Sequence, residues 1–344
     1  MQYENEDKGC GLCKSCLSIE RHLLIANIFY AVFFVCIGIL SFIVYNTSEK
    51  WLYKLLPTKY ESVQTMRLFS VIRISFPLAI WYLIHAVVTV CNDQLDDTSW
   101  RFRFHTKALY LHAIGYFVIL LAFWYIPDQF YEGYIIFSII ASAFYLVLQL
   151  VFLIYLFLTL NDKLTEGTKL CLPITITVIF EAGALTVYGV SYYLFTKGSC
   201  QSNIILISVN LCICVLLFIL SIFIPRGSIL IVSLISAYCA YLTVSGLICL
   251  RTCNRLSSSS NNLGFAISSS LITLIWAGYS AFSGTNNFKA LIISNEEEDK
   301  IIPAFSMCFF HSLFTLASFY MGMVVTSWGM ADPDHEWMVD KGKI

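Results

Sequence analysis

The sequence predicts an all-α integral membrane protein with about nine transmembrane helices. Its composition is 58% hydrophobic and only 12% charged, whereas about a quarter of the residues in soluble domains are charged. Long apolar stretches follow one another with short connections, and each approaches the roughly 20 residues that a helix needs to cross about 30 Å of hydrocarbon. The stretches are continuous rather than alternating, which favours helices over the strands of a barrel.

The predicted spans occupy most of the chain. They cover residues 23–45, 68–90, 108–126, 134–160, 170–195, 204–224, 228–250, 263–284 and 302–328. The fourth would form a helix of about 40 Å, so we expect it to tilt or to extend beyond the hydrocarbon. In this scheme residues 1–22 are a cytosolic N-terminal segment, residues 23–328 the transmembrane domain and residues 329–344 a short tail.

Basic residues in the connections favour a cytosolic N-terminus. With that orientation the cytosolic segments carry a small excess of Lys and Arg, in the direction of the positive-inside rule. Cys200 and Cys253 then both lie in non-cytosolic loops, where oxidising conditions permit a disulfide between them. Two unrelated loop thiols are the alternative.

The last apolar stretch, FFHSLFTLASFYMGMVVTSW at residues 309–328, resembles the serine incorporator (Serinc) family. The family reads Phe-Phe-His, then Leu-Ala-Ser-x-Tyr, then Thr-Asn-Trp at this place, and the chain matches except that Ser327 replaces the asparagine. Shorter matches follow the family's order, among them RISF from Arg73, LQLVFLI around Gln149, SVNLCIC around Asn210 and AYCAYLTVSG at residues 237–246. The resemblance covers nearly the whole chain.

The resemblance implies two helical subdomains bridged by a long diagonal fourth helix. Members of the family have been connected with serine supply for phosphatidylserine and sphingolipid synthesis, and with energy-independent movement of phospholipids between leaflets. The chain departs from the family at Tyr155, where an aspartate is usual, so any role of that acid is absent. Residues 329–344 do not supply the family's tenth helix.

Polar residues recur on single faces of several predicted spans. In the last span, residues from His311 to Thr326 recur at helical spacing on one face. Helix packing through small and hydroxyl residues is the interpretation we favour. The alternative is a partly polar groove that a lipid headgroup follows while its tails stay in the bilayer. The candidate groove residues are Glu181, Arg73, His311, Ser318, Tyr238, Tyr241, Ser245, Gln149 and Asn210.

Glu181 is the strongest single candidate, because an acid near the middle of a span is costly unless it is paired or protonated. Arg73 is the nearest cation at a similar depth, although its side chain could equally extend to the interface. His112 and His311 also lie inside predicted spans, where a histidine is more often a hydrogen-bonding packing residue than a proton relay. Pro77 and Pro173 could break their helices and thereby form a site for serine.

The sequence contains no recognisable catalytic set. His335 and Glu336 lack the second histidine of a zinc hydrolase, and there is neither a nucleophile elbow nor a cluster of aspartates for a metal. We therefore expect a protein that is not an enzyme and needs no cofactor. Two functions compete: ATP-independent movement of lipids between leaflets, and a non-catalytic carrier or accessory role that supplies serine to lipid synthesis.

The expected partners are membrane phospholipids, with serine or lipid-synthesis enzymes in the second case. A net charge of −1 gives no reason to expect nucleic acid, and the sequence leaves a homo-oligomer open. We expect the protein in the endomembrane system or the plasma membrane.

Three cysteines, Cys10, Cys13 and Cys16, precede the first span in CGLCKSC. A closed zinc site needs four ligands, and His22 could be the fourth only from the membrane edge. A redox pair would normally belong to a thioredoxin-like unit, which the sequence lacks. Cysteines this close to a span are plausible acylation sites, so we predict S-acylation of one or more of them and no metal.

Overall fold

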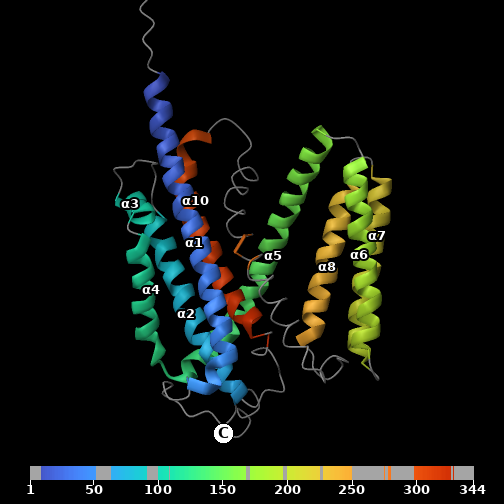
Figure 1. Cartoon of the computed structure of the whole chain (residues 1–344), viewed down its shortest axis with the longest axis horizontal. Helices are drawn as coiled ribbons and strands as arrows, with labels where there is room; N and C mark the ends of the chain where they lie inside the picture. The colour runs from blue at the N-terminus through green and yellow to red at the C-terminus, as the bar shows by residue number, and fades with distance from the viewer. Residues whose placement is uncertain are drawn as a thin grey trace, which may run out of the picture. The chain divides into compact units, whose positions relative to one another are not determined.

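In the computed structural model of the chain, the elements that the structure describes are α-helices without strands, which confirms the predicted fold class (Figure 1). The structure describes residues 9–51, 63–90, 100–107, 109–167, 171–196, 200–224, 228–249, 275, 278–279, 298–326 and 328. Among these residues, 7 helices are long and apolar enough to cross a membrane, or up to 8 if the bent pair α3 and α4 forms one span. The predicted span at 263–284 lies almost entirely outside the described residues.

The helices follow the apolar stretches in chain order. They are α1 (Gly9–Trp51), α2 (Val63–Thr89), α3 (Trp100–Thr106), α4 (Leu109–Trp124), α5 (Asp128–Gly167), α6 (Cys171–Phe195), α7 (Gln201–Phe223), α8 (Ile229–Cys249) and α10 (Glu298–Val325). Helix α1 begins well before residue 23, so residues 9–22 are helical and continuous with the first span. The breaks proposed at two prolines are wrong. Pro77 lies inside α2, and Pro173 lies in the first turn of α6, where proline is tolerated.

The third predicted span, residues 108–126, corresponds to α4, and the structure adds a short helix before it. Helix α4 has only 16 residues, and the short helix α3 precedes it at an angle of 79°. The last turn of α3 closes with a hydrogen bond of 2.8 Å from the Lys107 amide to the Arg103 carbonyl. The chain then turns sharply into α4, so the elbow lies directly before the predicted span, and α3 occupies part of the connection that precedes it.

Helix α5 is longer than predicted, with 40 residues and a length of about 60 Å. It begins at Asp128, directly after Pro127, where an acidic residue favours the positive end of the helix dipole. The turn from α4 is closed by backbone hydrogen bonds from Ile126 to Phe123 and from Phe130 to Pro127. The diagonal course expected for this helix stays a prediction.

The chain divides into two compact units. Unit 1 comprises Met1–Gln149 and Thr273–Ile344, and unit 2 comprises Leu150–Ile272. In unit 2, α6, α7 and α8 pack side by side (Figure 1). They enclose a core whose buried members are Ala184, Tyr188, Phe195, Ile207, Cys214, Ala240 and Leu247.

Unit 1 is built around the contact between α2 and α10. These are the most buried spans, with 72% and 78% of their apolar windows inside the protein, against 17% for α6 and α7. The contact is close at Gly322, where an added Cβ would lie 3.0 Å from the Ser75 hydroxyl oxygen. A side chain at this position would therefore push α10 away from α2.

Gly322→Leu should destabilise unit 1 by about 1–3 kcal/mol, the usual cost of overpacking a close interface. The measurement is thermal unfolding of the purified protein in detergent. Gly246→Leu is the control, because a Cβ at Gly246 meets nothing within 4 Å. Equal unfolding temperatures for the two variants would contradict the close contact between α2 and α10.

Candidate functional site

A buried ion pair fixes the end of α4 and the start of α5 to α2. The Arg73 side chain is fully buried, and its Nη2 lies 2.8 Å from Asp128 Oδ1. The same guanidinium donates to the carbonyls of Trp124 at 3.0 Å and Ile126 at 3.1 Å. It also lies over the Tyr131 ring, 4.9 Å from the centroid. Arg73 therefore neutralises an acid and satisfies carbonyls at the end of a helix, which have no intrahelical partner.

This arrangement answers one question that the sequence left open. Arg73 does not extend to the interface, because its side chain is buried and paired with Asp128. Its Nη1 is buried without a hydrogen-bond partner. The residue therefore has a structural role in unit 1 that the spacing of the sequence did not reveal.

Four of the chain's 6 histidines gather around Tyr30 in unit 1. His85, His105, His112 and His311 come from α2, α3, α4 and α10, and all four are buried. Their ring centroids lie 5.5, 5.1, 6.2 and 4.8 Å from that of Tyr30, respectively. We call these four residues the histidine cluster. Only two of them, His112 and His311, were identified from the sequence as polar residues inside predicted spans.

One half of the histidine cluster forms a chain that is neutral throughout. His105 Nε2 lies 3.1 Å from Asn27 Oδ1, and His105 Nδ1 lies 2.9 Å from His311 Nε2. Burial opposes a positive charge on these rings. With both rings neutral and the Asn27 amide oxygen accepting, His105 carries its proton on Nε2 and accepts at Nδ1 from His311. His311 Nδ1 is then an unprotonated, buried nitrogen, and it has no hydrogen-bond partner.

The other half of the cluster has a different proton count. His85 Nδ1 faces the Trp81 carbonyl at 2.8 Å, His112 Nε2 faces the Phe104 carbonyl at 2.7 Å, and the remaining nitrogens of the two rings face each other at 3.0 Å. Both carbonyls only accept, so three hydrogen bonds require three protons on four nitrogens. The pair makes all three bonds only with one shared proton and a positive charge, and its burial opposes that charge.

The histidine cluster has the contacts of a hydrogen-bonded network and not of a metal centre. Within the described part of the chain, no group of three His, Cys, Asp or Glu side chains could hold a metal ion. The ring nitrogens are instead directed at each other, at carbonyls and at an amide. Such a network can hold or pass a proton, and it fixes α3 and α4 against α2 and α10.

In unit 2, polar contacts follow one face of α6. Glu181 is half-buried near the middle of the helix, beside Ser236 of α8 and Cys214 of α7, and its Oε2 is buried without a hydrogen-bond partner. Two turns further along α6, the Tyr188 hydroxyl lies 3.5 Å from the Cys214 sulfur. Another turn on, the Tyr192 hydroxyl lies 2.6 Å from that of Ser208.

The structure distributes the predicted groove residues over both units. Arg73, Gln149, His311 and Ser318 belong to unit 1, and Glu181, Asn210, Tyr238, Tyr241 and Ser245 belong to unit 2. Of these, Tyr238 and Tyr241 come together as stacked rings 6.5 Å apart. Two others are not part of such a contact. Asn210 donates to the Leu206 carbonyl of its own helix, and Gln149 is buried, with no hydrogen-bond partner for its Oε1.

The polar stripe of α10 is a packing surface. His311, Thr315, Ser318 and Thr326 are all buried. The hydroxyls of the last three donate to carbonyls one turn earlier in α10. Together with the close approach at Gly322, this supports packing rather than a groove on that helix.

The predicted cysteine chemistry is only partly within the described side chains. Cys200 is disulfide-bonded, and Cys253 lies outside the described residues, so the pairing of the two stays a prediction. Cys10, Cys13 and Cys16 lie in the first turns of α1. Their S-acylation stays a prediction as well.

Sequence reasoning missed Asp128, His85 and His105. Asp128 follows Pro127 directly at the start of α5. An acidic residue at that position indicates a helix start and needs a partner if it is buried. His85 and His105 lie in or beside apolar stretches, where any ionisable residue is a candidate by default. None of the three could be paired with its partner from spacing alone.

The fold and these buried polar contacts define the class of protein. It is a multi-pass α-helical membrane protein with two helical units, one closed around an ion pair and a histidine cluster, the other carrying a half-buried acid.

The comparisons with known proteins give the family. Residues 6–301 match the family model "Serine incorporator (Serinc)", and the chain belongs to this family. It is 25% identical to a probable serine incorporator of Dictyostelium discoideum, over 87% of this chain and 80% of that protein. Membrane protein TMS1 of Saccharomyces cerevisiae is 25% identical, over 83% and 65%. Serine incorporator 3 of Bos taurus is 24% identical, over 69% of this chain and 56% of its own length.

Breaking the ion pair should be costly, because removing one partner leaves an uncompensated buried charge. We expect Arg73→Met to lower the free energy of unfolding by about 3–5 kcal/mol. The double variant Arg73→Met with Asp128→Asn should be less destabilised than the sum of the two single variants. Chemical unfolding of all four proteins in detergent measures the coupling, and strict additivity would contradict the pair.

The proton count of the histidine cluster can be measured directly. Solid-state ¹⁵N NMR of histidine-labelled protein in bilayers should show an unprotonated Nδ1 for His311 and a protonated Nδ1 for His85. A shared or exchanging proton should appear between His85 and His112. Single substitutions to Gln assign the signals, and a protonated His311 Nδ1 would contradict the neutral chain.

Proposed function

We propose that the protein moves phospholipids between the leaflets of a membrane without ATP. In this proposal the headgroup follows the polar face of α6 in unit 2, while the acyl chains stay in the bilayer. No catalytic residue takes part, so the role is a non-enzymatic one in lipid handling. Family membership supports a membrane protein of the serine incorporator type, and the lipid transport itself is our proposal.

The observation that carries this proposal is the environment of Glu181. The residue lies about 15 Å along α6 from its start at Cys171, in the middle of a helix that is long and apolar enough to cross the membrane. A carboxylate at that depth is costly unless a partner compensates it. Ser236 supplies one contact, but Oε2 is buried without a hydrogen-bond partner. The unsatisfied oxygen can accept a hydrogen bond from a passing polar group.

The contacts beyond Glu181 extend the polar face in one direction. Tyr188 and Tyr192 are seven and eleven residues further along α6, which places all three side chains on one face. Tyr188 is buried in the core of unit 2, so a headgroup can reach this face only at Glu181 and Tyr192, which are partly buried. Only 17% of the α6 window and of the α7 window is buried inside the protein. Headgroups with an ammonium group, such as ethanolamine, choline or serine, complement a carboxylate, and their acyl chains can stay against the exposed apolar side chains of these helices.

Serine delivery is the competing function. Free serine also presents an ammonium group to Glu181, and the relatives are named serine incorporators. A serine site needs donors for the carboxylate too, which broken helices commonly supply. The described part of α6 contains no such break, since Pro173 lies in its first turn.

Purified protein in liposomes tests the proposal. Labelled phospholipid in the inner leaflet should become accessible to an external quencher faster than in empty vesicles. Glu181→Leu should slow this exchange about tenfold, which corresponds to about 1.4 kcal/mol of lost stabilisation at the barrier. Thr175→Val is the matched control, because Thr175 lies on the same helix, is exposed and donates to its own Cys171 carbonyl at 2.8 Å.

The same preparation separates the two functions. Exchange no faster than in empty vesicles, together with binding of labelled serine, would overturn lipid transport and favour serine delivery. Equal rates for Glu181→Leu and the wild type would remove Glu181 from the path.

A further inference from the structure

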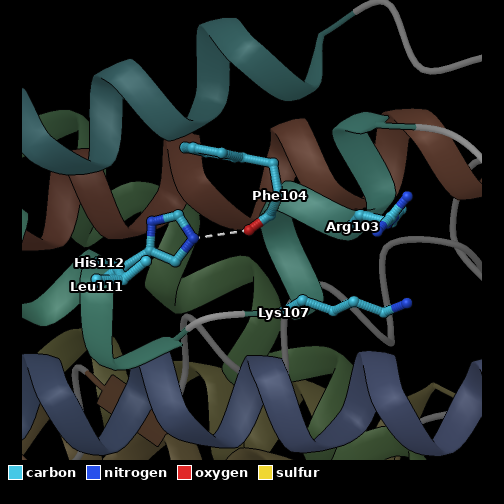
Figure 2. A pocket seen from close by; sticks show the side chains of 5 residues that line it. All are labelled: Arg103, Phe104, Lys107, Leu111 and His112. Atoms are coloured by element: carbon cyan, nitrogen blue, oxygen red, sulfur yellow. Dashed lines mark hydrogen bonds between the residues drawn. The ribbon is translucent and has the colours of Figure 1, made fainter.

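The elbow between α3 and α4 forms one side of an open cavity of about 440 Å³ (Figure 2). It is lined by Arg103, Phe104, Lys107, Leu111 and His112. We call it the elbow cavity. All of its lining residues belong to unit 1, so it is separate from the α6 face invoked above for transport.

Two cations face the elbow cavity from one side. Arg103 lies in the last turn of α3, and Lys107 directly follows the helix, joined to Arg103 by a backbone hydrogen bond. Both side chains are exposed, and in Figure 2 they extend in the same direction. Two neighbouring cations at this spacing can bind two oxygens of one phosphate group.

The start of α4 adds to the positive potential of the cavity. Helix α4 begins at Leu109, two residues after Lys107. The first amides of a helix have no intrahelical acceptor and carry the positive end of the helix dipole. Leu111 and His112, both in that first turn, line the cavity. The charge therefore comes from two side chains and, independently, from the backbone.

Histidine and apolar side chains form the remaining walls. His112 is held there by its hydrogen bond to the Phe104 carbonyl, drawn in Figure 2. Phe104 and Leu111 give the cavity an apolar side, which a free inorganic ion does not need. The apolar side continues onto α4, whose outward side chains Leu111, Ile114, Val118 and Leu121 are exposed.

The position of the elbow also fits a lipid. The 79° bend turns α3 away from the direction of α4. If α4 crosses the membrane, α3 lies closer to the plane of the interface, where Trp100 and the arginines of α3 are typical residues. Basic pockets between helices at this depth bind the phosphate of lipid headgroups.

We propose that the elbow cavity binds the phosphate group of a membrane lipid. Arg103 and Lys107 contact the phosphate oxygens, and the acyl chains lie along the exposed apolar face of α4. This site does not depend on the proposed transport, because it can hold a lipid without moving it.

Binding of two matched lipids tests the proposal. Native mass spectrometry of the purified full chain in detergent should retain dioleoyl phosphatidic acid in preference to dioleoylglycerol, which has the same tails without the phosphate. The double variant Arg103→Gln with Lys107→Gln should weaken the phosphatidic acid adduct about 30-fold. Lys163→Gln is the control, because it removes one exposed cation from α5 in unit 2.

Three results would overturn the proposal. They are equal retention of the two lipids by the wild type, equal loss in the Lys163→Gln control, and displacement of the lipid by inorganic phosphate at the same concentration, which would make free phosphate the ligand.

The thermal stability of the double variant is measured alongside, and Leu111→Gln, which leaves both cations in place, provides a second variant. It should weaken retention of phosphatidic acid by shortening the apolar wall, and unchanged retention would count against the lipid. The assay contains no leaflets, so its outcome is independent of the transport experiment.

Discussion

Unit 1 depends on a single guanidinium. The carbonyls at the end of a helix have no intrahelical partner, and a buried carbonyl without any partner costs about 1–3 kcal/mol. Arg73 supplies donors to two such carbonyls and to the carboxylate that opens α5. The turn between α4 and α5 is therefore tied to α2, and α2 is the helix on which α10 packs most extensively. Arg73 thus connects the α4–α5 turn to the helix that forms the largest interface of the unit.

The apolar pattern predicted most helices but not their interruptions. The ends of α6, α7 and α8 lie within a few residues of the predicted spans because a continuous apolar run must be helical in lipid. The short helix α3 and the bend before α4 were not predicted, and the contact that fixes α4 to α2 there, between His85 and His112, joins residues 27 positions apart. Hydropathy averages along the chain and contains no information about such pairs. Arg73 and Asp128 are 55 positions apart for the same reason.

The candidate site was predicted in part. Glu181 was identified from its position in the middle of an apolar stretch. In the structure its Oε2 is buried without a hydrogen-bond partner and can accept a hydrogen bond from a ligand. Whether the candidate groove residues line one groove could not be predicted from their spacing in the sequence. Residues on separate helices line a common groove only if those helices contact each other. The two units also differ in exposure: the apolar windows of α2 and α10 in unit 1 are mostly buried inside the protein, whereas α6 and α7 of unit 2 have large exposed surfaces.

Many hydroxyl groups in these helices are turned back onto their own backbone. Ser41, Ser70, Thr89, Thr175 and Thr186 each donate to a carbonyl one turn earlier, as the hydroxyls of α10 do. Such a residue offers little polarity to its surroundings, and its replacement by Ala or Val leaves no other group without a required partner. These positions can therefore drift between lineages at little energetic cost. Neutral drift of this kind is one physical route by which relatives about a quarter identical can retain a common helical architecture.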